Sequence, residues 1–227
     1  MPATIDPYAL IHKALRHQLT ATLDGLARTD WSDPEATAAS LDDLEVTLVT
    51  QEQHAHHEDA FYHPLLEERA PGCTQKFGQA HVALEARIGD IRTAADALRA
   101  SSEPSPADAH ALYLRYGQVF GLFLSHFDDE EIELHPLFRA LCTDDDLRGL
   151  ERQVVAANPP DAFATILPHF LAALGPGELI GWLGGLQAGM PPEVFGGVCA
   201  TAAEVLDAPR WAAVSGALGI EAPAPSP

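Results

Sequence analysis

Two copies of one short pattern place residues that could bind metal at a regular spacing. Each copy is a histidine, a glutamate four residues later and a proline six residues after the glutamate. The members are His54, Glu58 and Pro64 in the first copy and His126, Glu130 and Pro136 in the second. Residues four apart lie on one face of an α-helix, so the histidine and the glutamate of each copy can bind the same metal ion.

A single histidine precedes each copy, and it is also followed by a repeated pattern. Apolar residues stand three and seven positions after it, as His12, Leu15, Leu19 and as His81, Leu84, Ile88. Two helical hairpins related by a pseudo-twofold axis would bring four imidazoles and two carboxylates to one point. The sequence therefore predicts a dinuclear iron site with the ligands His12, His54, Glu58, His81, His126 and Glu130.

The spacing of histidine and glutamate is weak evidence when taken alone. In a chain with 11 histidines chance produces about one such pair, and four are present. Two of them, His63 with Glu67 and His81 with Glu85, lack the downstream proline. The shared proline, the His-Pro-Leu run in both copies and the two upstream histidines argue against coincidence.

The mixed ligand set indicates iron. Imidazole suits iron, zinc and copper, whereas carboxylates suit harder cations, so the combination favours iron over magnesium or calcium. Two glutamates could each bridge two ions roughly 3.5 to 4 Å apart, together with an oxide or hydroxide bridge. The remaining positive charge would attract peroxide or another small anion. Ferritin-type sites use a glutamate with a histidine three residues later, and no glutamate of this chain has one.

With these six residues the chain resembles the hemerythrin-like family, also called the HHE cation-binding domain. The resemblance covers about residues 5 to 142 and includes the prolines of both copies. It implies a four-helix bundle with two iron ions that binds O2, reacts with peroxide or NO, or senses iron and oxygen. Position by position, His12 and His81 match the lone histidines of the family's first and third helices.

The chain departs from the family pattern at two places. Oxygen-carrying members have a fifth histidine, and Glu58 stands where it would help, which argues against stable reversible O2 carriage. The family prefers an aromatic residue before each proline, and this chain has His63 and His135 there. At about 100° per residue, His63 should point about 160° from the ligand face. Both are expected to be surface groups or to lie behind the ligands.

Four further residues could assist the site. Tyr62 could hydrogen-bond or ligate an iron-bound species, although a buried core tyrosine is the favoured explanation. Arg16 and Glu85 stand one turn after His12 and His81 and could orient ligands. Glu133 could be an extra inward carboxylate. The remaining histidines are expected to be solvated, among them His17, His56, His57, His110 and His169.

Helical periodicity dominates the chain, and nothing reads as an alternating strand. We expect an all-α protein with an up-down-up-down four-helix bundle over residues 1–143, whose helices begin near Asp6, Glu35, Thr74 and Ser105. Bends are expected at Pro64 and Pro136. A smaller helical module of short segments should follow over 144–220, and 221–227 should be a disordered tail.

Within that module the run Pro159, Pro160, Asp161, Phe163 recurs as Pro191, Pro192, Glu193, Phe195. The repeat favours two short helical hairpins.

The composition of the chain disfavours two classes of binding partner. The net charge is −20 and only 13 residues are Lys or Arg, which disfavours nucleic acid and anionic membranes. The three cysteines form no close pair and suit a reducing compartment. Neither a charged-then-apolar leader nor a spanning apolar run is present, so we expect a cytoplasmic location.

Three functional classes stay open. The first is an enzyme that decomposes peroxide or carries out related diiron oxidations. The second is a sensor or binding module that signals through the C-terminal helices without turnover. The third is a metal-free interaction protein, which would be indifferent to substitution of the proposed ligands.

Overall fold

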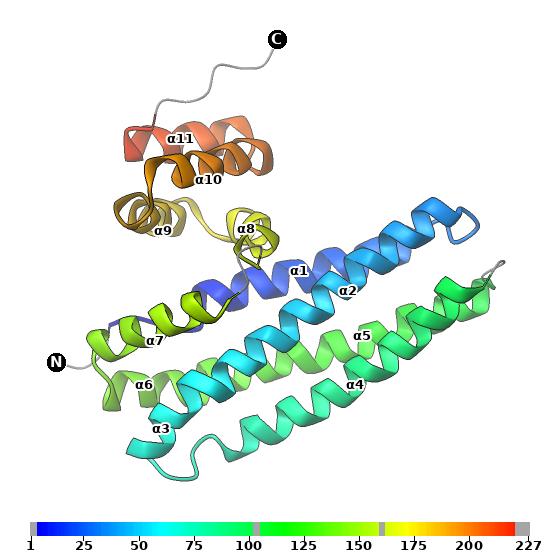
Figure 1. Cartoon of the computed structure of the whole chain (residues 1–227), viewed down its shortest axis with the longest axis horizontal. Coiled ribbons are helices and arrows are strands. Elements are labelled where there is room, and N and C mark those ends of the chain that lie inside the picture. Colours follow the sequence, from blue (N-terminus) through cyan, green and yellow to red (C-terminus); the bar gives the residue numbers. More distant parts are fainter. Residues whose placement is uncertain (1–3, 102–104, 159–161, 221–227) are drawn as a thin grey trace. The chain divides into compact units, whose positions relative to one another are not determined.

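The computed structural model describes residues 4–101, 105–158 and 162–220, and within these ranges every regular element is helical (Figure 1). The all-α prediction is therefore confirmed for the described chain. The chain divides into two compact units, Met1–Asn158 and Pro159–Pro227. None of the described helices combines the length and apolar character needed to cross a bilayer. The expected tail, 221–227, lies outside the described residues.

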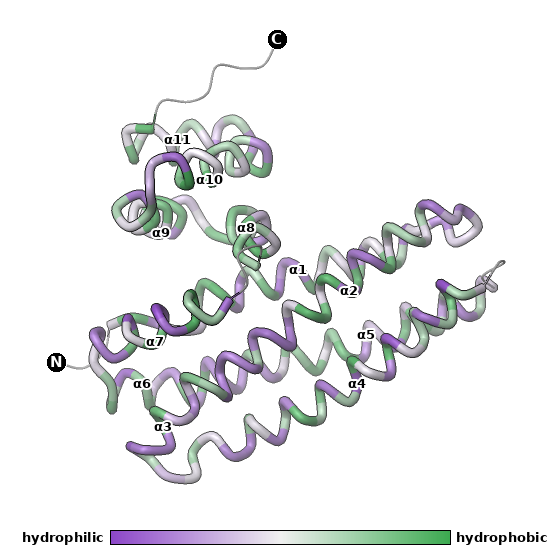
Figure 2. Tube along the Cα trace, viewed as in Figure 1, coloured by the Kyte–Doolittle hydropathy of each residue, from purple (hydrophilic) through white to green (hydrophobic). Residues whose placement is uncertain are grey.

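Four long helices make up most of the N-terminal unit. They are α1 (Ala9–Arg28), α2 (Pro34–His57), α4 (Gln75–Ala100) and α5 (Pro106–Asp129). Helix α1 packs against α2 and α5, and α4 packs against the same two helices, so the contacts form a closed ring. Hydrophobic and hydrophilic residues alternate along each of these helices (Figure 2), and the apolar stripes form the shared core.

Two of the helix starts follow the signals in the sequence. The Asp33 side chain accepts hydrogen bonds from the backbone N–H groups of Glu35 and Ala36, with Pro34 in the first turn. The Ser105 side chain accepts from the N–H of Asp108, with a proline in the first turn of that helix too. Polar caps satisfy N–H groups that have no partner inside the helix, which is why these positions begin helices.

The two helices that carry the repeated histidine, α2 and α5, each continue into one π turn before the proline of that copy. The π segments η1 (Glu58–Tyr62) and η2 (Glu130–Leu134) lead into the short helices α3 (His63–Arg69) and α6 (His135–Leu141). In these turns the N–H of His63 donates to the carbonyl of Glu58, and that of His135 donates to Glu130. The expected bends at Pro64 and Pro136 therefore take the form of a wider turn, because a proline ring clashes with the carbonyl four residues back.

The helix α7 (Asp144–Ala157) belongs to the N-terminal unit, and this corrects the expected division after Thr143. Its residues Leu147 and Leu150 join a buried cluster with Tyr8, Leu66, Phe77, Leu134, Phe138 and Cys142. The side chain of Thr143 and that of Asp146 form a reciprocal capping box at its start. Arg69 of α3 then binds Asp146, with 2.9 Å between Nη1 and Oδ2. Through Asp146, the Asp-rich start of α7 therefore connects this helix to α3 of the same unit.

The C-terminal unit contains four short helices, α8 (Ala162–Ala173), α9 (Pro176–Gly189), α10 (Pro192–Val205) and α11 (Ala208–Leu218). Helix α8 packs on α10 and α9 packs on α11, so the two halves of the expected duplication contact each other. The core residues include Leu171, Leu183, Phe195 and Trp211. Of the repeated run, Pro159, Pro160 and Asp161 lie outside the described residues.

Candidate metal centre

The six predicted ligands come together in the middle of the N-terminal unit. They form two overlapping groups, His12, His54, Glu58, Glu130 and Glu58, His81, His126, Glu130. Within each group the donor atoms all lie within 4.8 Å of one another. Two glutamates are common to both groups, while each group has its own pair of histidines. This is the arrangement expected when two ions share two carboxylates.

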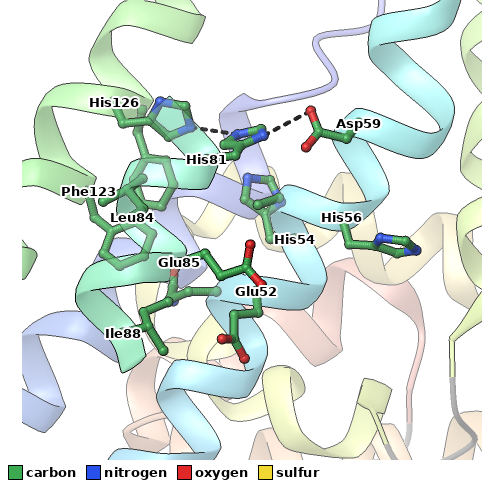
Figure 3. Close-up of a pocket in the computed structure, with 13 residues that line it drawn as sticks. Glu52, His54, His56, Asp59, His81, Leu84, Glu85, Ile88, Phe123 and His126 are labelled. Carbon is green, nitrogen blue, oxygen red and sulfur yellow. Dashed lines mark hydrogen bonds and ion pairs between the residues drawn. The ribbon is translucent and has the colours of Figure 1, made fainter. Parts of the chain in front are cut away.

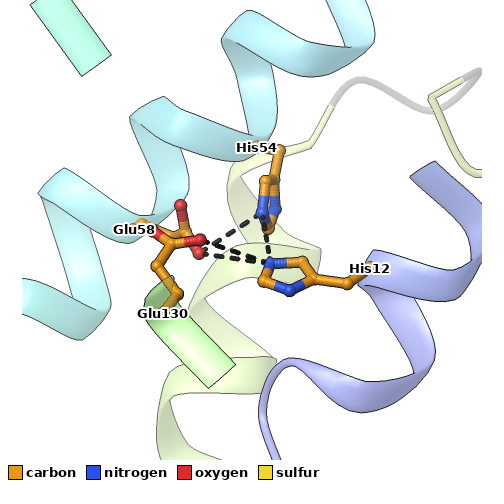
Figure 4. A group of neighbouring side chains, drawn as sticks. All are labelled: His12, His54, Glu58 and Glu130. Carbon is orange, nitrogen blue, oxygen red and sulfur yellow. Dashed lines mark hydrogen bonds and ion pairs between the residues drawn. The ribbon is translucent and has the colours of Figure 1, made fainter. Parts of the chain in front are cut away.

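The spacing inside each histidine pair suits one ion. The Nε2 atoms of His12 and His54 lie 3.1 Å apart (Figure 4), and those of His81 and His126 lie 2.8 Å apart. Two donors bound to one ion at about 2.1 Å and at right angles are about 3 Å apart. Each pair therefore presents its nitrogens at the separation of neighbouring ligands.

The glutamates link the two pairs. Glu58 places Oε1 3.3 Å from Nε2 of His54 and Oε2 3.4 Å from Nε2 of His81. Glu130 places Oε1 3.1 Å from Nε2 of His126 and Oε2 3.5 Å from Nε2 of His12. Each carboxylate thus turns one oxygen toward each histidine pair, which is the geometry of a bridging ligand.

The oxygens of these two carboxylates are buried without a hydrogen-bond donor in the described structure. Glu58 and Glu130 are only 2% and 0% exposed, and none of their four oxygens accepts a hydrogen bond in the described structure. An unpaired buried carboxylate costs several kcal/mol, so such groups normally bind a metal or a cationic side chain. The donor set therefore fits a pair of bound cations.

Without metal, the imidazoles compensate this negative charge unequally. Burial lowers the pKa of His81, but its contacts with Glu130 and Glu58 outweigh that effect and raise it to about 10. Burial alone would raise the pKa of Glu58, but the neighbouring histidines outweigh that effect and hold the pKa well below its usual value. Burial lowers the pKa of His54 to about 4, which leaves this imidazole neutral at pH 7 and able to donate a lone pair.

A second carboxylate lies behind each lone histidine. Glu131 Oε1 lies 2.9 Å from Nδ1 of His12, and Asp59 Oδ1 lies 3.0 Å from Nδ1 of His81. Both residues directly follow a motif glutamate and contact the histidine of the other half of the unit. A carboxylate hydrogen-bonded at Nδ1, as Glu131 is at His12, can fix the ring with Nε2 toward the other donors, whereas the contact of Asp59 with His81 is an ion pair without hydrogen-bond geometry. The acidic residue after each motif glutamate was the sequence signal for this role, and the motif search missed it.

The two supporting carboxylates have different neighbours. Arg16 donates to Glu131 from Nη1 at 2.6 Å and to Asp128 from Nη2 at 2.8 Å. Hydrogen bonds from His12 and Arg16 lower the pKa of Glu131 to about 2. Asp59 is instead 2.8 Å from Nδ1 of His63. Arg16 therefore contacts the carboxylate that lies behind His12.

His63 lies behind a candidate ligand, which is one of the two positions expected for it, although the helical angle alone pointed it away from the ligand face. It is buried, and its ring stacks on His81 with centroids 5.5 Å apart and planes 7° apart. The π turn inserts one residue before it and so changes the face on which it lies by about 100°. His135, at the equivalent place in the second copy, pairs with Asp6 at 3.4 Å and is partly exposed.

The other candidates lie around the centre at different depths. Tyr62 packs edge-on against Phe138 with centroids 6.0 Å apart, and burial raises its pKa, as expected for a core tyrosine. Glu133 forms an ion pair with Lys76 and is 48% exposed, so it is not an inward carboxylate. Tyr8 was missed by the sequence analysis: its ring stacks on His12 at 5.0 Å and its buried hydroxyl has no partner in the described structure.

Glu85 lines a cavity of about 340 Å³ that reaches the centre (Figure 3). The cavity is bounded by α2, α4 and α5, and His54, His81 and His126 are among its lining residues. It is the structural feature through which small molecules could approach the donors.

Comparisons with models of known protein families, with curated proteins and with solved structures found no match. The chemistry of the centre is therefore argued from its own geometry.

Proposed function

We propose that this protein is a hemerythrin-like diiron protein whose four histidines and two glutamates hold two iron ions in an up-down-up-down four-helix bundle. The observation that carries the proposal is the pair of buried glutamates, each with one oxygen toward each histidine pair and none with a hydrogen-bond partner in the described structure. Two cations between them would satisfy all four oxygens at once.

Iron is the metal that this donor set favours. Four imidazoles make the site too nitrogen-rich for magnesium or calcium, and two bridging carboxylates are harder ligands than copper(I) prefers. A bound iron pair supplies electron exchange with small oxidants, and O2, peroxide and NO are the partners that we propose. The protein's own contribution is to hold the imidazoles by Asp59 and Glu131 and to surround the donors with apolar side chains.

Reaction with a small oxidant is favoured over sensing by the cavity that reaches three of the histidines. The separate C-terminal unit keeps the sensor as the second candidate, since a sensor needs an output surface. The three free cysteines fit a reducing cytoplasm, which is the location that we infer.

Metal analysis of the purified protein tests the proposal. Loading with Fe(II) under air should give two irons per chain and the near-ultraviolet absorption of an oxide-bridged diferric pair. Glu58→Gln should strongly reduce both signals at limiting iron, and the matched surface variant Glu133→Gln should retain them. A single tightly held zinc ion, or iron loading that survives Glu58→Gln, would contradict the proposal.

Turnover separates the two candidate functions. An enzyme should decompose H2O2 when loaded with iron and lose this activity in Glu130→Gln. A sensor should show no turnover and should change the protease sensitivity of residues 162–220 on iron loading.

A further inference from the structure

The two carboxylates that lie behind the lone histidines have different cationic partners. Glu131 pairs with the guanidinium of Arg16, whose Nη1 lies 2.6 Å from its Oε1. The ion-pair partners of Asp59 within the described structure are imidazoles only. The position equivalent to Arg16, four residues after the lone histidine, is Glu85 in the second half. The duplicated unit therefore provides a permanently charged cation to one of the two carboxylates and none to the other.

Asp59, His63 and His81 form a third group of possible metal ligands, in addition to the two groups of the centre. Oδ1 of Asp59 lies 2.8 Å from Nδ1 of His63 and 3.0 Å from Nδ1 of His81. The donor atoms of the group all lie within 4.8 Å of one another. Two ligands bound to one ion at about 2.1 Å and at right angles are about 3 Å apart. The carboxylate oxygen therefore stands at the separation of neighbouring ligands from both ring nitrogens.

The contact between Asp59 and His81 is not explained by a hydrogen bond. Nδ1 of His81 is buried without a hydrogen-bond partner among the described residues, although the carboxylate of Asp59 is close to it (Figure 3). The other nitrogen of this ring, Nε2, faces His126 and Glu58 of the centre. A buried polar atom without a partner destabilises the protein. An ion at Nδ1 would satisfy this atom and leave Nε2 to the centre, and the ring would release its proton when it binds on both sides.

The third group is accessible from solvent on one side. Asp59 is 44% exposed, whereas both imidazoles are buried. Asp59 and His81 also line the cavity of about 340 Å³, where water could complete the coordination of an ion, since one water occupies roughly 30 Å³ of the liquid. Two imidazoles and one carboxylate, with water in the remaining position, are a ligand set typical of zinc.

We propose that Asp59, His63 and Nδ1 of His81 bind one divalent ion of the zinc type next to the diiron centre. This ion supplies at Asp59 the positive charge that Arg16 supplies at Glu131. The inference goes beyond the proposed function, because the six ligands of the iron pair leave each of these three donor atoms free.

Zinc binding to the protein loaded with two irons tests the third site. Competition with a chromophoric chelator should show one further zinc per chain in the wild type. His63→Phe keeps an aromatic ring against His81 but removes both nitrogens, and should weaken the binding of this zinc about tenfold or more. The matched variant His135→Phe, at the equivalent position of the second copy, should retain it. A wild type that takes up no further zinc, or equal zinc affinities in the two variants, would overturn the proposal.

A second pair of variants keeps the test decisive if His63→Phe does not fold. Glu85→Arg, at an exposed residue, gives the second half the cation of the first and leaves all three ligands in place. The arginine competes with zinc for Asp59 and should weaken zinc binding about tenfold or more. Asp90→Arg, exposed on the same helix, changes the charge by the same amount and should have a smaller effect. A loss in Glu85→Arg no larger than that in Asp90→Arg would overturn the assignment of the ion to Asp59.

Iron and zinc are counted separately in every sample. Fewer than two irons in the wild type would count against the diiron function alone, because the loss of one zinc in His63→Phe can be measured whichever metal fills the centre. Two irons without a further zinc would count only against the third site.

Discussion

The two halves of the N-terminal unit, residues 9–69 and 75–141, have the same candidate donors in the same order but different surroundings. At the lone histidine of the first half, Arg16 binds the carboxylate that lies behind the ring, and at that of the second half His63 binds the corresponding carboxylate and stacks on the histidine. The comparison teaches that a duplicated ligand set can be kept while the residues one position away diverge. The spacing of the candidate ligands alone therefore says little about what surrounds each histidine.

The largest difference should appear at the position that follows the motif histidine. Phe127→Ala removes a buried ring that stacks on His12, and should lower the free energy of unfolding by about 3 to 5 kcal/mol. Ala55→Gly at the equivalent position should cost only about 1 kcal/mol, from helix propensity. Urea unfolding of the metal-free protein measures both, and equal losses would show that the two sides are packed alike.

Removal of a bridging carboxylate should affect both halves alike. Glu58→Gln and Glu130→Gln each leave both ions short of one oxygen, and each should weaken iron binding by roughly 100-fold or more, about 2.7 kcal/mol. Competition with a calibrated chelator gives the affinities. If one variant bound both ions normally, that glutamate would not be a bridge.

The supporting carboxylates should have smaller effects. Asp59→Asn and Glu131→Gln keep all six donors but free one imidazole each, and should weaken iron binding by roughly 10-fold to 100-fold. Asp128→Asn is the control for Glu131, because Asp128 binds Arg16 without contacting His12 in the described structure. Affinities of Asp59→Asn and Glu131→Gln that match wild type would show that burial alone orients the rings.

The smallest effect concerns the ion pair between Arg69 of the first half and Asp146 of α7. Hydrogen bonds from Arg69 and Thr143 lower the pKa of Asp146, so this group stabilises the fold above the ordinary carboxyl pKa and ceases to do so as the pH falls through the lowered value. Asp146→Asn should therefore cost at most about 1 kcal/mol at pH 7. The difference from wild type should shrink below about pH 4, as followed by thermal unfolding across pH. A difference that persisted at low pH would show a loss unrelated to this charge.

Much of the fold was predictable because its signals are local. Apolar stripes, the caps at Asp33 and Ser105 and the prolines at 64 and 136 depend on a few neighbouring residues, and the helices begin and change course close to these positions. The division after Thr143 was wrong, because nothing local shows that Leu147 and Leu150 complete a core made by distant residues. The Asp-rich run there marks a helix start, which is not the same as a unit boundary.

For the candidate site, the sequence by itself placed His54 beside Glu58 and His126 beside Glu130, because residues four apart share a helical face whatever the rest of the chain does. Only the tertiary structure decided what stands behind and beside them. The contacts of Asp59 with His81 and of Glu131 with His12 join different helices, and His63 is buried because a π turn shifts its register. The cavity beside the centre depends on packing between α2, α4 and α5. No spacing of residues along one helix specifies the volume that is left between three helices.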